Sequence, residues 1–255
     1  MGALDGKHAL ITGGGSGIGA AIARTLAQAG AAVSIAGRRA GPLEEVAAQL
    51  PRAKAIVADV TSEADCAAMA VAARAAHGPI DILVANAGAA DSAPAAKIYL
   101  AHWQRMIDVN LTGAFLSVKA ALPDITRGGA RAGRVVFIAS TAGLKGYPYV
   151  AAYCAAKHGV IGLARALAAE LAPREVTVNA VCPGFTQTPL LEASLANIAA
   201  KTGRSRAEAE ADLKRLNPQG RFITPQEVAD TVRWLCTPAA QSITGQAISV
   251  SGGEV

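Results

Sequence analysis

Tyr153 and Lys157 are separated by four positions in a stretch with helical periodicity. On an α-helix this spacing places two side chains on one face, one turn apart. A tyrosine phenol has a pKa of about 10, and a nearby ammonium group favours its ionised form. We therefore expect Lys157 to lower the pKa of Tyr153, so that the phenol exchanges a proton near neutral pH as a general acid or base.

Two further polar residues have the chemistry to assist such a proton transfer. Ser140 follows the apolar run Arg134–Ala139, and its hydroxyl is suited to stabilising negative charge that develops on a substrate oxygen. Asn110 lies inside the predicted helix Trp103–Ala121. Because asparagine is unfavourable in a helix interior, we expect a functional reason for its presence. The candidate catalytic residues are thus Asn110, Ser140, Tyr153 and Lys157.

A glycine-rich turn follows the first apolar run of the chain and leads directly into a predicted helix. Glycines allow a tight turn and a close approach of the backbone to a pyrophosphate, and the helix N-terminus offers free N–H groups and a favourable dipole. Placed after the first strand of an α/β sheet, such a turn indicates a dinucleotide site. Its predicted cofactor-binding residues are Gly13, Gly15, Ser16, Gly17, Ile18 and Gly19.

Short apolar runs alternate with longer stretches of helical period along the whole chain. We predict strands at His8–Thr12, Ala32–Ala36, Ala55–Val57, Ile80–Ala85, Arg134–Ala139, Val176–Val181 and Ala247–Val250. The predicted helices are Ile18–Gln28, Leu43–Leu50, Cys66–Ala76, Trp103–Ala121 and Ala155–Leu171. This alternation predicts an α/β fold, a doubly wound parallel sheet of Rossmann type with about seven strands and helices on both faces. We expect residues 1–255 to form a single domain.

The end of the second predicted strand bears on the choice of cofactor. A carboxylate at this position would bind the ribose 2′-hydroxyl of NAD, but the chain has Gly37, Arg38 and Arg39 there. An arginine can pair with the 2′-phosphate of NADP. We therefore expect NADP(H) to be favoured, with NAD(H) as the alternative, unless the two arginines are only a solvated pair at a loop.

The glycine spacing G-x-x-x-G-x-G, preceded by Thr12, resembles that of the short-chain dehydrogenase/reductase family, and the resemblance covers nearly the whole chain. It implies that Asn110, Ser140, Tyr153 and Lys157 form the family's catalytic tetrad, in which the lysine also contacts the nicotinamide ribose. Ala85 departs from the family pattern by replacing the first Asn of N-N-A-G. The further cofactor contacts that the resemblance implies are Asp59, Val60, Asn86, Ala87, Gly88, Pro183, Gly184, Thr186 and Thr188.

The expected reaction is the interconversion of a ketone and a secondary alcohol. Segments such as Tyr153–Val160 are most similar to ketoreductases that act on 3-oxoacyl thioesters, and we expect a substrate of that kind, bound to CoA or a carrier protein. The alternatives are a cyclic or aromatic alcohol or ketone, 3-hydroxybutyrate, and a non-catalytic dinucleotide sensor. The expected substrate contacts are Ser140, Thr141, Tyr147, Tyr153 and Gln187.

An irregular insertion from about residue 186 to 222 follows the sixth predicted strand and contains the amphipathic stretch Arg204–Leu216. Long connections in compact domains often serve binding, so we expect a helical lid over the active site, with a surface helix pair as the alternative. Its cations either receive a phosphate of CoA or a carrier protein or solvate a helix. They are Lys201, Arg204, Arg206, Lys214, Arg215 and Arg221.

Composition excludes several other classes of protein. The net charge is +5, but lysine and arginine are scattered, so we expect no nucleic-acid partner. The four cysteines show no metal-ligand spacing, which favours reduced thiols in the cytoplasm and no metal site. No stretch is long and apolar enough to suggest a membrane span. The alanine-rich faces of Trp103–Ala121 and Ala155–Leu171, together with the resemblance, predict a homotetramer, unless these faces pack only within the subunit.

Overall fold

The computed structural model describes residues 2–127 and 133–255 and contains one parallel sheet of seven strands. The strand order is β3-β2-β1-β4-β5-β6-β7, so the winding direction reverses between β1 and β4, where such folds place their ligands. The strands are β1 (His8–Thr12), β2 (Ala32–Gly37), β3 (Ala53–Val57), β4 (Ile82–Ala85), β5 (Arg134–Ile138), β6 (Thr177–Pro183) and β7 (Ala247–Val250). The predicted doubly wound α/β fold is confirmed, with each predicted strand present.

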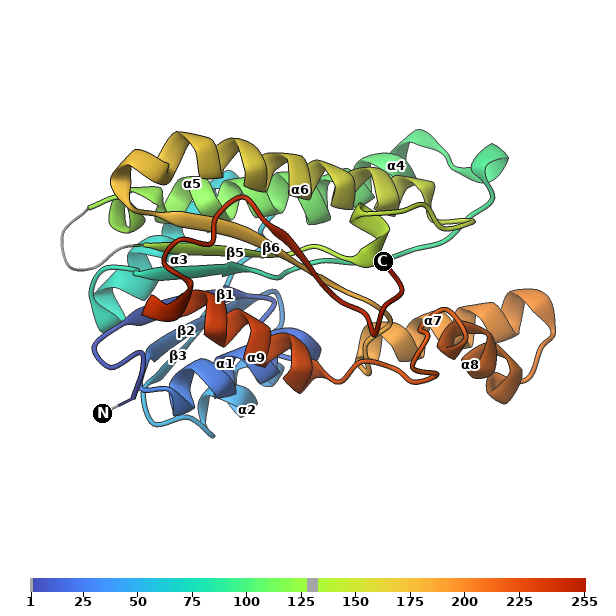
Figure 1. Ribbon diagram of the computed structural model, residues 1–255, viewed down its shortest axis with the longest axis horizontal. Helices are drawn as coiled ribbons and strands as arrows, with labels where there is room; N and C mark the ends of the chain where they lie inside the picture. Colours follow the sequence, from blue (N-terminus) through green and yellow to red (C-terminus); the bar gives the residue numbers. More distant parts are fainter. Residues whose placement is uncertain (1, 128–132) are drawn as a thin grey trace.

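Helices cover both faces of this sheet (Figure 1). Alternate residues of β1 enter separate apolar cores, with Leu10 on one face and Ala9 and Ile11 on the other. The Leu10 face packs against α3 (Glu63–His77), α5 (Gly113–Ile125) and α6 (Ala151–Leu171). The opposite face packs against α1 (Gly17–Gln28), α2 (Ala40–Ala47) and α9 (Pro225–Cys236).

The segment predicted as one helix over Trp103–Ala121 is interrupted, and the single-helix prediction is wrong. α4 (Leu100–Ile107) is followed by a π-helical turn at Asp108–Thr112, and α5 begins after it. Asn110 lies in the wide turn, and its side-chain amide donates a hydrogen bond of 3.0 Å to the Met106 carbonyl. Single π-helical turns of this kind are frequent at functional sites.

Sequence reasoning missed α9, which packs beside α1 and completes one layer of the fold. The signal was present in the chain, since Thr224 and Glu227 form a capping box around Pro225 at the first helical position. The Thr224 hydroxyl accepts a hydrogen bond from the Glu227 backbone N–H, and the Glu227 carboxylate accepts one from Thr224 N at 2.8 Å. This reciprocal pair is a recognised start of a helix.

The insertion folds into α7 (Pro189–Thr202) and α8 (Arg206–Lys214). Figure 1 shows the two helices projecting at one end of the molecule, on the side reached by the end of β6. They share a small apolar cluster of their own, to which Leu191, Leu195, Ala209 and Phe222 contribute buried side chains. The insertion therefore has a compact structure that adjoins the sheet without adding a strand to it.

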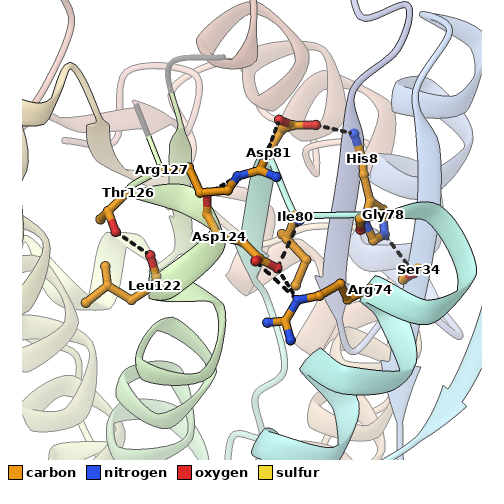
Figure 2. A network of polar contacts seen from close by, with 10 residues as sticks. All are labelled: His8, Ser34, Arg74, Gly78, Ile80, Asp81, Leu122, Asp124, Thr126 and Arg127. Atoms are coloured by element: carbon orange, nitrogen blue, oxygen red, sulfur yellow. Dashed lines mark hydrogen bonds and ion pairs between the residues drawn. The ribbon is translucent and has the colours of Figure 1, made fainter. Parts of the chain in front are cut away.

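The amino ends of β1 and β4 are joined by a network of buried polar groups (Figure 2). Asp81 accepts a hydrogen bond of 2.9 Å from His8 N. Asp124 accepts a hydrogen bond of 3.2 Å from Ile80 N and forms an ion pair with Arg74 at 3.1 Å. The His8 ring contacts the Gly78 carbonyl at 2.8 Å through Nδ1. Because a carbonyl only accepts, Nδ1 carries the proton of a neutral ring. Burial lowers the pKa of His8.

Candidate active site and cofactor cleft

Two adjoining cavities open at the carboxyl ends of the strands, with volumes of about 880 and 200 Å³. The larger is bounded by the glycine-rich turn, the four candidate catalytic residues and helices α7 and α8. Every residue expected to contact the cofactor lines one cavity or the other. These residues are Gly13, Gly15, Ser16, Gly17, Ile18, Gly19, Arg38, Arg39, Asp59, Val60, Asn86, Ala87, Gly88, Tyr153, Lys157, Pro183, Gly184, Thr186 and Thr188.

The glycine-rich turn is tightly packed against the loop after β4. A Cβ at Gly19 would lie 2.2 Å from the Gly13 carbonyl oxygen, so any side chain there would displace the turn. The Thr12 hydroxyl accepts hydrogen bonds of 3.1 Å from the backbone N–H groups of Asn86 and Ala87, which ties the loop after β4 to the turn. Ser16 makes no side-chain bond to the first turn of α1, so the N–H groups there face the cavity uncapped.

The smaller cavity lies at the end of β2 and is lined by Arg38, Arg39 and Asp59. Asp59 is held by Thr61, whose backbone N–H and hydroxyl donate to its carboxylate at 2.9 and 2.8 Å. Arg38 and Arg39 are exposed, and neither forms an ion pair with a carboxylate of the described residues. Two guanidinium groups without an acidic partner suit a group that carries a phosphate.

Asn110 fastens the loop after β4 to the π-helical turn. Its Oδ1 accepts from Ala89 N at 3.2 Å, and its Nδ2 donates to Ala89 O at 2.9 Å. Asn110 is therefore almost fully buried with both ends of its amide satisfied. The interior asparagine that the sequence singled out thus positions the backbone at the floor of the larger cavity.

Ser140 and Tyr153 meet at the end of β5. The Ser140 oxygen accepts a hydrogen bond of 3.1 Å from Ala142 N and begins a short 3-10 turn, and the Ser140 hydroxyl is also hydrogen-bonded to Tyr153. Lys157 lies one turn of α6 beyond Tyr153, with its Nζ 5.7 Å from the centre of the tyrosine ring. The Lys157 ammonium donates to the Ile138 carbonyl at 2.8 Å. The predicted one-face arrangement of Tyr153 and Lys157 is present.

The expectation of an acidic phenol is not met. Burial raises the pKa of Tyr153 to about 12, although its hydrogen bond with Ser140 acts in the opposite direction. Burial also lowers the pKa of Lys157 to about 8. The physical reason is that removal from water disfavours the charged form of both groups. Tyr153 is therefore protonated at neutral pH, which is the form needed to give a proton to a substrate.

Most of the expected substrate contacts lie at the larger cavity, but one does not. Ser140, Thr141, Tyr147 and Tyr153 line it, whereas the side chain of Gln187 is exposed and lines neither cavity. The reason is local pairing, because Thr186 forms a bridge with Ile223 and Gln187 N bonds to the Ile223 carbonyl at 2.9 Å. This pairing leaves the Gln187 side chain facing solvent.

Sequence reasoning missed the residues that the insertion and the loop after β4 bring to the larger cavity. Their contacts depend on how distant segments fold together, and no motif marks them. One contact joins these segments directly, since Asn197 Nδ2 on α7 donates to Ser92 Oγ at 3.0 Å. The missed lining residues include Asp91, Ser92, Phe185, Ser194, Asn197, Ile198, Leu213 and Leu216.

The cations of the insertion are already engaged. Lys201 Nζ donates to the Ser92 carbonyl at 3.0 Å, and the other five form ion pairs with carboxylates. Those pairs are Arg204–Asp212, Arg206–Glu192, Lys214–Glu210, Arg215–Asp212 and Arg221–Glu227. Among the described residues, Lys157 is the one cation that lines the larger cavity. Of the two interpretations of these cations, the structure favours helices stabilised by surface pairs.

The loop between β5 and α6 holds a strained residue at the rim of the larger cavity. Tyr149 has φ of +68°, a left-handed conformation that bulky residues rarely adopt. Its carbonyl accepts a hydrogen bond of 2.8 Å from Ala93 N, which joins this loop to the one after β4. Strain of this kind persists where surrounding contacts enforce it, and it is concentrated at functional sites.

Comparison with known proteins agrees with this geometry. The family model described as short chain dehydrogenase matches residues 7–199. The chain belongs to the short-chain dehydrogenases. It is 37% identical to a putative ketoacyl reductase of Streptomyces coelicolor, over 99% of this chain and 98% of that protein.

Two solved structures of ketoreductases have the same fold. A variant of actinorhodin polyketide ketoreductase with NADPH superimposes with a TM-score of 0.93 at 37% identity, covering 97% of each chain. A 3-ketoacyl-(acyl-carrier-protein) reductase from Brucella melitensis complexed with NADH gives 0.88 at 34% identity, covering 98% of this chain and 99% of that one. The present short-chain dehydrogenase is accordingly an oxidoreductase that uses a nicotinamide dinucleotide and interconverts a ketone and an alcohol. No helix of its described residues meets the length and apolarity needed to traverse a bilayer.

Proposed function

We propose that the protein is a ketoreductase that converts the 3-oxo group of an acyl thioester to a secondary alcohol, with NADPH as the hydride donor. The observation that carries the proposal is that Tyr153, hydrogen-bonded to Ser140, lines the same cavity as the uncapped glycine-rich turn. The ketoacyl reductases to which the chain is similar support this substrate class.

The side chains divide the work of the reduction between them. When bound, the reduced nicotinamide supplies the hydride that adds to the carbonyl carbon. Tyr153, kept protonated by burial, gives its proton to the carbonyl oxygen as the electron pair moves there. The Ser140 hydroxyl, which lines the same cavity, would donate to the same oxygen and stabilise it. Lys157 compensates the phenolate that forms, and Asn110 holds the backbone of Ala89 in place.

The preference for NADPH rests on Arg38 and Arg39. Both line the cavity at the end of β2, where no carboxylate occupies the position that would bind a ribose 2′-hydroxyl. The 2′-phosphate would give these guanidinium groups their anionic partner. Relatives with NADPH and with NADH both exist, so the preference belongs to these residues and not to the fold.

Cyclic or aromatic ketones are a second candidate substrate class. One observation favours them, namely that the insertion cations are paired and therefore offer no preformed site for a CoA phosphate. A cavity of about 880 Å³ with mainly apolar walls accommodates a bulky neutral ketone. The absence of a second cation among its described lining residues disfavours free 3-hydroxybutyrate, whose carboxylate needs one.

A substrate panel tests both candidates. Rates are measured with NADPH and NADH for acetoacetyl-CoA, acetoacetyl-N-acetylcysteamine, free acetoacetate and a cyclic ketone. We expect the highest kcat/KM with NADPH and a thioester. Equal values for the two thioesters would show that the CoA phosphates add no affinity. A cyclic ketone that exceeds both by tenfold would replace the first candidate with the second, and no turnover of any ketone would refute both.

We further propose that residues 1–255 act as one catalytic domain with residues 186–222 as a substrate lid. The contacts of Asn197 and Lys201 with Ser92 tie α7 to the loop after β4 across the larger cavity. Hydrogen exchange in 189–214 is the measurement, and we expect slower exchange when cofactor and substrate analogue are both bound. Identical exchange in the free and bound protein would leave the insertion without a lid function.

We also propose a homotetramer in the cytoplasm. Helices α4, α5 and α6 lie on one side of the molecule (Figure 1), and there Trp103 and Phe115 remain 38% and 44% exposed. Large apolar side chains left at a surface are typical of subunit contacts. Light scattering on the eluting protein should give the mass of four chains, and a monomer would contradict it. All four cysteines are free thiols, as is usual in a reducing compartment.

A further inference from the structure

The penultimate residue of the chain is a buried acid next to the substrate cavity. The side chain of Glu254 is only 1% exposed, although it lies one residue from the C-terminus. Its Oε1 accepts a hydrogen bond from the Tyr147 hydroxyl and forms an ion pair with Lys145 Nζ at 3.0 Å. Because burial of a carboxylate is costly unless its charge is compensated, this placement calls for a structural or functional reason.

The path of the chain after β7 fixes this carboxylate in place. The Val250 carbonyl accepts from Gly184 N at 3.0 Å, which holds the strand end against β6. At Gly252 the backbone has φ of +66°, and a Cβ there would lie 2.1 Å from Asn217 Oδ1. The tail therefore passes in contact with the segment after α8 before Glu254 reaches Tyr147.

The direction of the hydrogen bonds follows from counting protons. The Tyr147 hydroxyl contacts both Glu254 and Thr141 Oγ1, the latter at 2.7 Å, but has one hydrogen. An ionised carboxylate only accepts, so Tyr147 donates to Glu254 and Thr141 donates to Tyr147. Burial, together with the bond to Glu254, raises the pKa of Tyr147, which keeps the phenol protonated.

Thr141 and Tyr147, the two residues hydrogen-bonded in series to Glu254, face the cavity directly. Thr141 and Tyr147 both line it, and Thr141 immediately follows Ser140 in the chain. The Tyr147 ring also has neighbours on its sides. The Phe185 ring packs edge-on against it with 6.1 Å between the two ring centres, and Lys145 Nζ lies 5.0 Å from the centre of the Tyr147 ring. Glu254 itself does not line the cavity, but its hydrogen-bonded partner Tyr147 does.

We propose that Glu254 is a positioning residue whose carboxylate holds Tyr147 against Thr141 and thereby shapes the substrate-facing wall beside Ser140. The second carboxylate oxygen, Oε2, is buried and has no hydrogen-bond partner among the described residues. Glu254 therefore depends on its Oε1 contacts with Tyr147 and Lys145. The activity arm of the test rests on the proposed ketoreductase function, whereas the exchange arm below does not.

The activity arm compares Glu254→Ala with Glu254→Gln, using acetoacetyl-N-acetylcysteamine and NADPH. We expect Glu254→Ala to raise KM for the thioester about tenfold, as loss of a hydrogen bond to a charged group does, with a smaller change in kcat and in KM for NADPH. Glu254→Gln keeps an acceptor oxygen and should recover most of the loss. Glu63→Gln, which removes an exposed carboxylate paired with Lys119, is the matched control and should match the wild type.

A double-mutant cycle separates positioning from general stability. Tyr147→Phe removes one oxygen atom and should itself raise KM, and adding Glu254→Ala to it should cause little further increase. Independent, additive effects would overturn the proposal. If Glu254→Ala does not fold, Tyr147→Phe and Glu254→Gln still complete the comparison.

The exchange arm needs no substrate. We expect faster hydrogen exchange in residues 141–150 of Glu254→Ala than in the wild type, with no change in those residues for Glu63→Gln. Unchanged exchange in 141–150, or an unchanged KM, would refute the positioning role. A wild-type protein that reduces no ketone would instead refute the proposed function, and the exchange result would still decide this inference.

Discussion

At the amino ends of β1 and β4, buried polar groups bond mainly to one another, whereas at the carboxyl end of the sheet polar groups line open cavities. Asp81 and Asp124 accept from backbone N–H groups and from arginines (Figure 2). At the other end, Ser16 leaves the first turn of α1 uncapped, and Ser140 and Tyr153 line the larger cavity. One end of the sheet is arranged for stability, and the other keeps polar groups available for ligands.

The largest expected effect comes from a substitution at the carboxyl end of the sheet that stops the proton transfer and leaves the fold intact. Tyr153→Phe removes the proton donor, so kcat should fall about 100- to 10,000-fold. NADPH binding, measured by calorimetry, and the thermal midpoint should stay close to those of the wild type. Substantial remaining turnover would mean that another group supplies the proton.

Cofactor choice tests the smaller cavity at the same end. Arg38→Ala removes a guanidinium that has no acidic partner among the described residues, so kcat/KM with NADPH should fall about 10- to 100-fold while that with NADH changes little. Arg24→Ala is a matched control, because Arg24 is bonded to Gln49 on the surface. Equal losses with both cofactors would argue against recognition of a 2′-phosphate by Arg38.

The amino end should respond in stability and not in catalysis. Asp124→Ala leaves the buried N–H of Ile80 without its acceptor and Arg74 without its partner, which should lower the free energy of unfolding by about 2 kcal/mol. Chemical denaturation measures this loss. The kcat of the folded variant should equal that of the wild type, and a large drop in kcat would show that the two ends are coupled.

The smallest expected effect is the pH dependence of stability that His8 contributes. Its pKa is lowered from 6.5 in the folded protein, so below that pH the unfolded chain binds a proton that the folded protein excludes. Stability should therefore decrease as the pH falls through 6.5 toward the lowered value, and His77 adds to the trend in the same direction. His8→Gln should reduce the change of the thermal midpoint with pH. An unchanged pH dependence would mean that other groups cause it.

The sequence predicted those features that depend on residues close together in the chain. The strands were found because buried parallel strands are continuous apolar runs, and Tyr153 and Lys157 were found because a helix fixes their relation. The π-helical turn was missed because helical periodicity does not distinguish one continuous helix from two helices joined by a wide turn. The pKa of Tyr153 was predicted in the wrong direction because spacing reveals a nearby cation but not the burial of the phenol.

The contacts of Gln187 and Glu254 could not be predicted for a different reason. Gln187 turns outward because its backbone pairs with Ile223, and Glu254 reaches Tyr147 from 107 positions away in the chain. Both depend on segments that meet only when the insertion and the tail have folded onto the end of the sheet. Short-range periodicity in the sequence carries no information about such long-range contacts.

The wide turn at Asp108–Thr112 has a consequence for length changes in this part of the chain. In a π-helical turn the backbone hydrogen bond spans five residues and not four, so the turn accommodates one residue more than a turn of regular α-helix. Deleting one residue here would let α4 and α5 merge into a single regular helix with their faces unchanged, and Asn110 would lose the wide turn from which it bonds to Ala89. A regular helix that kept the residue would instead rotate α5 by about 100° relative to α4, and the apolar stripe of α5 would no longer face the sheet. The wide turn thus lets the segment hold Asn110 at the cavity while α5 still packs on the core.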